Sequence, residues 1–164
     1  MSKTTPTSMV DYQLDVFECG SDDLHLIVPL LDQFHAESGH NVVADFDAEV
    51  WLRSMQSLVD HGMARVTYTQ RDRVPVAFMA AYISANLFNG DIQVQEQAWY
   101  VQKACRTDPD AWMLMRELEE WSASIGARRI LVTHLNNKTG DRLRSILPRF
   151  GYQPLELYYA KELN

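Results

Sequence analysis

The sequence predicts an α/β (α+β) domain in which a mixed, mostly antiparallel central sheet is flanked by helices. Two observations indicate this class. Stretches of alternating or continuous apolar residues, which are typical of strands, lie between segments whose apolar residues recur every three or four positions, as in helices. Their order along the chain is a strand, two helices, three strands, a helix, a strand, a helix and a final strand region.

The first half of the chain is expected to begin with a tail. Residues 1–11 are rich in Ser, Thr and Pro and are predicted to be disordered, so that one domain spans residues 12–164. A helix capped by Asp22 and Asp23 is predicted to follow a short strand at 14–17 and to end at Gly39. The later elements are a helix from Asp47 to Gly62, two strands within 63–88 around a turn at 70–73, and a strand within 91–102.

The second half continues with an amphipathic helix that follows the loop at 102–110 and ends at Gly126. A compact apolar strand, "RRILVTH", occupies residues 128–134. A short helix, "DRLRSIL", is predicted to stop at Pro148, because proline removes a backbone donor and disrupts the preceding turn. The segment after Gly151 is predicted to form one or two strands.

Composition and charge exclude several classes. The 164-residue chain carries a net charge of −7, which disfavours nucleic acid as the main partner, because phosphate backbones attract clustered Lys and Arg. No apolar run is long enough for a membrane helix, no signal peptide is recognisable, and the two cysteines are far apart. A cytoplasmic protein with no metal site is expected. The basic residues concentrate locally, in a pattern that suits a small anion or a phosphorylated cofactor: Arg128, Arg129, Lys138, Arg142, Arg144 and Arg149.

The loop before the central helix has two interpretations. Backbone N–H groups at a helix N-terminus can bind phosphate, especially where glycines let the backbone approach closely. In "VQKACRTDPDAWMLMRELEEW", residues 101–121, Thr107 and Pro109 stand where such glycines would lie. Asp108 is well placed to cap the helix, and both Asp108 and Asp110 would repel an anion. The segment is therefore either a phosphate-binding loop or an ordinary capped helix start.

Residues 94–161 resemble the GNAT family of N-acetyltransferases, which transfer an acetyl group from acetyl-CoA to an amine. The family motif is a strand ending in Val, then Arg or Gln, two residues, Gly, one residue, and Gly or Ala at the start of a helix. Here Val101 ends the strand, and "RTDPDA", residues 106–111, keeps the Arg and the final Ala. "LMRELEEWSASIGARRILVTHLN" is similar to the family's helix and fifth strand, and "RFGYQPLELYYAKEL" to its terminal hairpin. Together with "EQAWYV", this last stretch is similar to GNAT proteins common in bacteriophage genomes.

The resemblance implies a GNAT-like sheet whose fourth and fifth strands splay apart. These strands would end near Val101 and His134 and run parallel, with the helix from Pro109 to Ile125 as the crossover between them. The pantetheine arm of acetyl-CoA would lie between them. The residues then expected to bind the cofactor are Tyr100, Val101, Arg106, Thr107, Asp108, Ala111, Asn136 and Asn137.

The resemblance also implies catalytic roles. Glu96, on the fourth strand, is the candidate base, because a carboxylate buried beside aromatic residues has a raised pKa; the alternative is a solvated residue on an alternating strand. The family often has a Tyr that protonates the leaving thiolate, but Leu147 occupies that position, so the role is either absent or filled by another group such as His134 or Tyr159. His134 could equally be structural, and Asn136 and Asn137 are equally good turn residues.

Two functions remain open from the sequence. The first is an acetyl-CoA-dependent N-acetyltransferase that acts on an amine of a small molecule or a protein by direct attack. The second is a catalytically inactive GNAT-fold binding protein, for example a phage protein that engages a host factor. The expected partners are accordingly the amine acceptor, a second copy of the chain or a host protein.

Overall fold

The computed structural model describes residues 15–39, 45–134, 138–156, 159 and 161. Its centre is a five-stranded sheet in the order β1-β2-β3-β4-β5. The strands β1 to β4 are antiparallel neighbours, whereas β4 and β5 run parallel. The mixed, mostly antiparallel sheet that the sequence predicts is therefore confirmed. The strands are β1 (Phe17–Glu18), β2 (Ala64–Arg71), β3 (Val74–Ala85), β4 (Ile92–Val101) and β5 (Arg129–Leu131).

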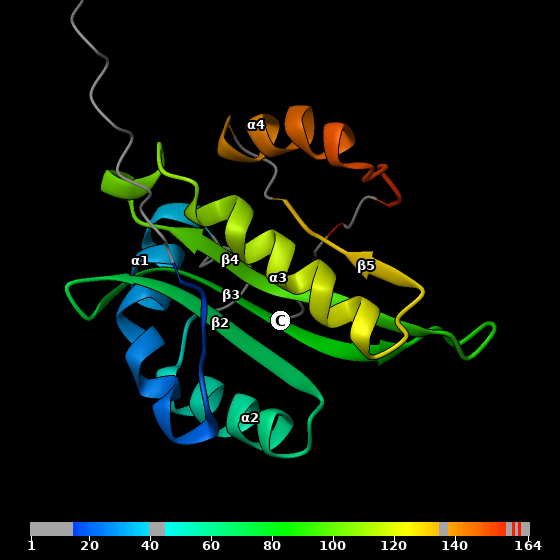
Figure 1. Ribbon diagram of the computed structural model, residues 1–164, viewed down its shortest axis with the longest axis horizontal. Coiled ribbons are helices and arrows are strands. Elements are labelled where there is room, and N and C mark those ends of the chain that lie inside the picture. Colours follow the sequence, from blue (N-terminus) through cyan, green and yellow to red (C-terminus); the bar gives the residue numbers. More distant parts are fainter. Residues whose placement is uncertain (1–14, 40–44, 135–137, 157–158, 160, 162–164) are drawn as a thin grey trace, which may run out of the picture.

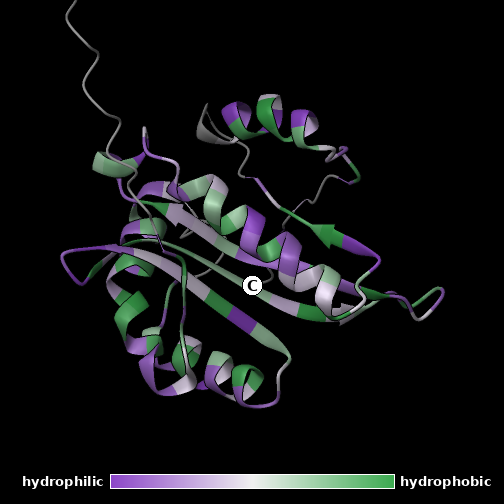
Figure 2. Ribbon diagram, viewed as in Figure 1, coloured by the Kyte–Doolittle hydropathy of each residue, from purple (hydrophilic) through white to green (hydrophobic). Residues whose placement is uncertain are grey.

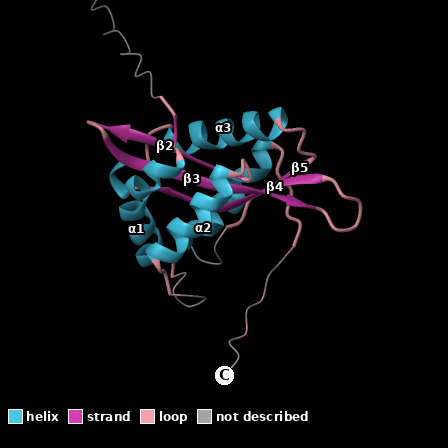
Figure 3. Cartoon of the chain, turned by 90° about the horizontal axis from the view of Figure 1, so that it is seen from below, coloured by secondary structure: helices cyan, strands magenta, loops and turns pink. Residues whose placement is uncertain are grey.

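Helices cover both faces of this sheet. Figure 3 shows α1 and α2 on one side and α3 on the other, and Figure 1 shows α4 beyond α3. α3 connects β4 to β5 and is the crossover helix that the sequence predicts. The helices are α1 (Val28–Ser38), α2 (Ala48–Asp60), α3 (Asp110–Ser124) and α4 (Lys138–Ile146), with short 3₁₀ helices η1 (Ser21–Ile27), η3 (Lys103–Cys105) and η4 (Leu147–Phe150).

Two apolar clusters hold these layers together, and alternate residues of the strands contribute to each. One lies between the sheet and α1 and α2, and includes Val66 and Phe78. The other lies between the sheet and α3, and includes Met79 and Leu114. Figure 2 shows hydrophobic residues along the strands and hydrophilic ones on the outer side of α3. Burial of these residues, rather than local propensity, fixes the helices against the sheet.

A two-residue turn joins β2 to β3. Asp72 and Arg73 have φ values of 50° and 66°, and tight hairpins of this kind require positive φ at both central positions because the twist of the turn must match that of the strands. The register also shifts between Thr69 and Gln70. This end of the hairpin brings Arg71 to the first residue of α3, as its hydrogen bonds to Asp110 show.

Several predicted boundaries are wrong. Asp22 and Asp23 do not cap the first helix: a 3₁₀ segment intervenes, its N-cap is Gly20, and no side chain caps it. Asp47 does cap α2, since its carboxylate accepts from the N–H groups of Glu49 and Val50. Residues 152–156, predicted as strand, are not in a strand. The predicted tail, 1–11, lies outside the described residues.

Candidate active site

β4 and β5 stay paired over only a short distance. The parallel register joins Gln93, Val94 and Gln95 to residues 129–131, and then β5 ends, while β4 continues to Val101. Beyond Gln95, Thr133 approaches a side chain of β4 instead of its backbone. Its N–H and its hydroxyl both donate to Oε2 of Glu96, at 3.0 and 2.9 Å. The Glu96 carboxylate thus occupies the point where the two strands part.

A β-bulge in β4 sets the direction of the side chains around Glu96. The register pairs Ala80 with Ala98 but Ala81 with Glu96, so Gln97 is the additional residue. Such an insertion changes which face the following residues present. Accordingly Val94 and Trp99 pack toward α3, an odd separation that an unbroken strand would place on opposite faces. Gln97 instead accepts a hydrogen bond from the indole of Trp51 in α2.

Glu96 is deeply buried, with 4% of its surface exposed. Burial raises the pKa of its carboxyl from 4.5 to about 7, because a charged group is disfavoured away from water. The two hydrogen bonds from Thr133 act in the opposite direction by stabilising the carboxylate. The interpretation of Glu96 as a solvated residue is therefore wrong. A carboxyl with this pKa can exchange a proton near neutral pH.

The first residue of α3, Asp110, is anchored through a buried carboxylate. Asp110 is completely buried, and it accepts hydrogen bonds from the hydroxyl of Thr69 and from Nη1 and Nη2 of Arg71, the latter two at 3.2 and 2.8 Å. Both partners belong to β2. Asp110 therefore fastens the first turn of α3 to the sheet through an ion pair between distant parts of the sequence.

Asp108 does not cap α3 as the sequence predicts. Pro109 is the N-cap residue, and no side chain caps this helix. The carboxylate of Asp108 lies 3.5 Å from Nη2 of Arg71 instead. Within the described part of the chain, no hydrogen bond joins the N–H groups of Thr107, Asp110 or Ala111 to an acceptor. The N–H groups of Thr107 and Ala111 are therefore available to an external anion, whereas Asp110 is completely buried.

Arg106 is paired with a residue that sequence analysis did not single out. Its Nε donates to the carbonyl oxygen of Val101 at 3.0 Å, and its Nη2 lies 2.5 Å from Oε2 of Glu37 at the end of α1. Glu37 also accepts from the hydroxyl of Tyr100 at 2.8 Å. Burial alone would raise the pKa of Glu37, but the hydrogen bonds from Arg106 and Tyr100 lower it overall. Tyr100 and Val101 thus serve in the described structure as supports for Arg106.

The remaining predicted site residues are dispersed. His134 is exposed and directly follows Thr133, the residue that contacts Glu96. Tyr159 is 92% exposed in the C-terminal segment. Leu147, at the position of the family's Tyr, is buried in the cluster beneath α3. Asn136 and Asn137 lie outside the described residues.

Sequence reasoning missed three contributors to this region: Arg71, Glu37 and Thr133. Each acts on a residue more than 30 positions away in the chain, as the contacts Arg71–Asp110, Glu37–Arg106 and Thr133–Glu96 show. No local pattern marks such partners. The sequence does show that Arg71 lies beside a tight turn, but this position alone does not indicate an ion pair.

The sheet, the crossover helix and the parting of β4 and β5 together make a GNAT-like fold. No protein-family model matches the chain, and no curated protein matches it in sequence. Solved structures do match. The aminoglycoside acetyltransferase HMB0005 from an uncultured soil metagenomic sample superposes with a TM-score of 0.75 and 18% identity, over 93% of this chain and 99% of that one.

Two further acetyltransferases show the same similarity in structure. AAC(6')-Iy, in complex with a CoA-containing bisubstrate analogue, has a TM-score of 0.73 and 16% identity, covering 92% of this chain and 99% of its own. The ribosomal-protein-alanine N-acetyltransferase of Brucella melitensis biovar Abortus has a TM-score of 0.69 and 15% identity, covering 92% and 99%. At these identities the likeness establishes the fold. In the described residues, no helix is long and apolar enough to cross a membrane.

Proposed function

We propose that this protein is an acetyl-CoA-dependent N-acetyltransferase in which Glu96 is the general base. One observation carries the proposal: a buried carboxyl with a pKa of about 7 lies where β4 and β5 part. A structural carboxylate would be expected to pair with a cation, as Asp110 does with Arg71. Among the described residues Glu96 has only the two donors of Thr133, so it remains able to take up a proton.

The proposed reaction is direct transfer between two bound substrates. Glu96 accepts a proton from the ammonium group of the acceptor, directly or through one water. The neutral nitrogen then attacks the carbonyl carbon of the acetyl thioester, the C–N bond forms, and the C–S bond breaks. The CoA thiolate leaves with the electron pair of that bond and takes up the second proton that the nitrogen loses, so that the products are the amide and the CoA thiol. Because thiols ionise near pH 8.5, the thiolate can depart without an acid from the protein, which is consistent with Leu147 at the position of the family's Tyr.

The loop before α3 offers a fit for the phosphates of acetyl-CoA. The N–H groups of Thr107 and Ala111 would donate to the pyrophosphate, as helix N-termini do in other phosphate sites. Arg106 and Lys103 would add positive charge, although both lie near Glu37, at 2.5 and 3.7 Å. Asp108 opposes this binding. We therefore expect the loop to bind acetyl-CoA with moderate affinity. The pantetheine arm would extend from the phosphates at the loop to Glu96.

The acceptor proposed is a cationic amine. The chain has 22 acidic against 15 basic residues, so its field attracts cations and raises their association rate. Similar solved structures include aminoglycoside acetyltransferases, one of them in complex with sisomicin, and a ribosomal-protein-alanine N-acetyltransferase. We therefore propose an amine of a small polycationic molecule first, and a protein amine second.

Two measurements test the proposal. Acetyl-CoA at a hundred times its dissociation constant should raise the free energy of unfolding by about 2.7 kcal/mol, read as an upward shift in Tm. Thiol release should then be followed with acetyl-CoA and a panel of aminoglycosides, polyamines and peptide N-termini. Glu96→Gln, which preserves the shape of the side chain, should bind acetyl-CoA like the parent but lose about 10² to 10⁴ in kcat. Unchanged turnover in this variant would overturn the role of Glu96.

A second function has a specific observation in its favour. The N-terminus of α3 carries two carboxylates, Asp108 and Asp110, and Arg71 and Arg106 are already paired with carboxylates. This arrangement suits a GNAT-fold binding protein that has lost the cofactor, such as a phage protein that engages a host factor. If acetyl-CoA at millimolar concentration causes no shift in Tm, the result would favour this second function and contradict the first.

A further inference from the structure

The indole N–H of Trp99 is a donor that the described part of the chain leaves unused. Its Nε1 is sealed from solvent and has no hydrogen-bond partner among the described residues. Buried polar groups are nearly always paired, because a donor that loses water without gaining an acceptor destabilises the fold. Trp99 belongs to β4, the strand that carries Glu96. An unpaired donor beside a candidate reaction centre requires a physical explanation.

Trp99 lies between Glu96 and the loop before α3, which are the two ends of the proposed acetyl-CoA site. It follows Glu96 by three residues, which at the rise of a strand places its Cα about 10 Å along β4. β4 then ends at Val101, whose carbonyl oxygen accepts from Arg106 in the loop before α3. The β-bulge at Gln97 turns Trp99 toward α3. A molecule with its thioester at Glu96 and its phosphates at the loop must therefore pass this side chain.

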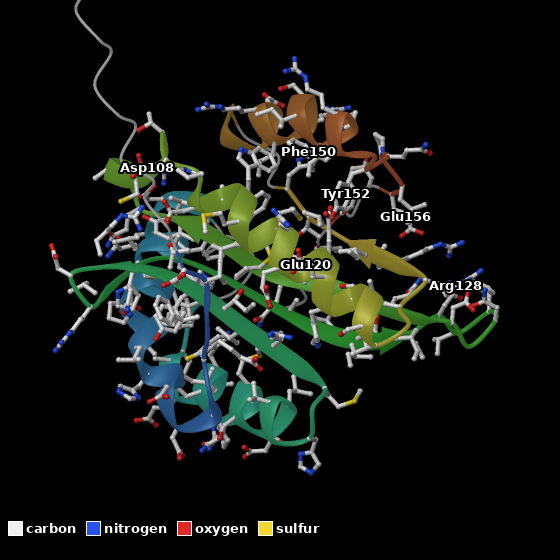
Figure 4. All side chains as sticks on the ribbon, viewed as in Figure 1. Asp108, Glu120, Arg128, Phe150, Tyr152 and Glu156 are labelled. Atoms are coloured by element: carbon white, nitrogen blue, oxygen red, sulfur yellow. The ribbon has the colours of Figure 1, made fainter. Side chains whose placement is uncertain are left out.

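Two aromatic rings stand next to the Trp99 indole. Trp112, in the first turn of α3, meets it edge to face, with centroids 5.9 Å apart. Phe150, in η4, stacks on Trp112 at 4.4 Å with the planes 19° apart. Figure 4 shows Phe150 between the α4–η4 segment and α3. Phe150 is 51% exposed, so its ring can turn into solvent more easily than a core residue.

We propose that Trp99 is a positioning residue for the acyl donor. On entry of the donor, the stacked rings of Trp112 and Phe150 beside the indole shift together, and the Nε1–H of Trp99 donates to an amide carbonyl of the pantetheine arm. The arm carries two amide carbonyls between its thiol and its phosphate, and a neutral indole N–H is a suitable donor for a neutral carbonyl. This inference rests on the proposed acetyltransferase function and assigns the chain a side-chain contact that selects pantetheine thioesters.

The test uses the full chain and the variant Trp99→Phe, which keeps an aromatic ring and removes only the N–H donor and part of the indole. Calorimetry measures the dissociation constants for acetyl-CoA, for pantetheine and for 3'-phospho-ADP, which has phosphates but no arm. We expect acetyl-CoA and pantetheine to bind about five- to tenfold more weakly, the typical effect of one neutral hydrogen bond. Binding of 3'-phospho-ADP should stay within twofold, whereas general damage to the site would weaken all three.

Trp121→Phe is the matched control, because it removes an indole N–H from the same apolar cluster, further along α3 and outside the aromatic stack, and that N–H is not among the unpaired buried donors of the described residues. Its affinities for the three ligands should stay within twofold of the parent. Nitrogen-15 spectra add a direct readout: the chain has four tryptophans, and the Trp99 resonance is the one that Trp99→Phe loses. That resonance should move downfield with pantetheine. If it does not move while the parent binds pantetheine, Trp99 makes no such hydrogen bond and the inference is wrong.

Phe150→Ala tests whether the stack of Phe150 on Trp112 has to shift when the donor binds. Because no stack has to shift in this variant, pantetheine should associate several-fold faster than with the parent. Slower or unchanged association would overturn this part of the inference. The outcomes also separate the two levels of proposal. A parent that binds neither acetyl-CoA nor pantetheine contradicts the acetyltransferase function and this inference with it, whereas a parent and a Trp99→Phe variant with equal affinity contradict only the role of Trp99.

Discussion

Thr133 donates twice to the same oxygen of Glu96, through its backbone N–H at 3.0 Å and its hydroxyl at 2.9 Å. The paired residues of β5 end at Leu131, so these two hydrogen bonds lie just beyond the ladder between β4 and β5. A side chain of β4 therefore makes the contact at the point where the strands part. This relationship links the shape of the sheet to the ionisation of the candidate base, because the same two donors hold the pKa of Glu96 below the value that burial alone would give.

The hydroxyl of Thr133 should tune the pH dependence of turnover. In the parent, the rate should rise with pH through about 7, because the base must be deprotonated. Thr133→Val removes one hydrogen bond to the carboxylate, which should raise the pKa of Glu96 and move the midpoint up toward about pH 8. Thr133→Ser keeps the hydroxyl and should retain the parental midpoint. Identical pH–rate profiles in the Val and Ser variants would contradict the link between Thr133 and the base.

Glu96 should make the stability of the parent fall as pH rises. Its folded pKa of about 7 exceeds its unfolded value of 4.5, so between these values the folded state holds a proton that the unfolded state releases. The free energy of unfolding is then lost progressively from about pH 4.5 to 7 and is constant above. Glu96→Gln does not titrate and should therefore gain stability relative to the parent as pH rises, on the order of 3 kcal/mol in total.

Urea unfolding of the parent and of Glu96→Gln at pH 5 and pH 8 measures this difference. Every other titrating group is common to both proteins, so the change in the difference reports Glu96 alone. If the free energy of unfolding depends on pH equally in the two proteins, Glu96 ionises at its ordinary pKa in the folded state. It would then not be a suitable base near neutral pH.

The contact between Asp110 and Arg71 should be worth far more to stability than that between Asp108 and Arg71. Asp110 is fully buried, and its loss leaves a partly buried guanidinium without its closest partner. Asp110→Asn should therefore lower the free energy of unfolding by about 3 kcal/mol, the lower end for a broken buried pair. Asp108→Asn alters an exposed contact at 3.5 Å and should change the free energy of unfolding by about 0.5 kcal/mol or less. Urea unfolding that ranks the two variants equally would refute this assignment.

The loop charges should act on acetyl-CoA in opposite directions. Asp108→Asn removes an exposed negative charge and should strengthen binding about fivefold, the equivalent of about 1 kcal/mol at the surface. Arg106→Ala should weaken binding tenfold or more, the usual effect of losing a charged hydrogen bond. Arg53→Ala removes an exposed arginine of α2, on the other side of the sheet from α3 (Figure 3), and is the control that should have no effect. If calorimetry gives the same affinity for all three variants, this loop does not hold the phosphates.

Local patterns in the sequence determine much of the fold. The spacing of apolar residues predicts α2, α3 and the strands β2 to β4, because one face of each must be buried whatever its partner is. Glycines mark the ends of α1 and α3, where the chain turns at Gly39 and Gly126 with φ of 70° and 73°. The parallel neighbours β4 and β5 were predicted only through the resemblance of the motif at 101–111 and of the element order to the GNAT family.

Only the tertiary structure decided what the charged residues do. Asp108 and Asp110 look alike in the sequence, yet one is an exposed partner of Arg71 and the other a fully buried anchor for α3. Glu96 reads as one polar residue of an alternating strand, and its pKa near 7 arises from its burial between β4 and Thr133. The energy of a charge depends on its solvation and on partners brought in from distant parts of the chain. Sequence spacing carries no record of either, so the chemistry of this site becomes defined only when the chain has folded.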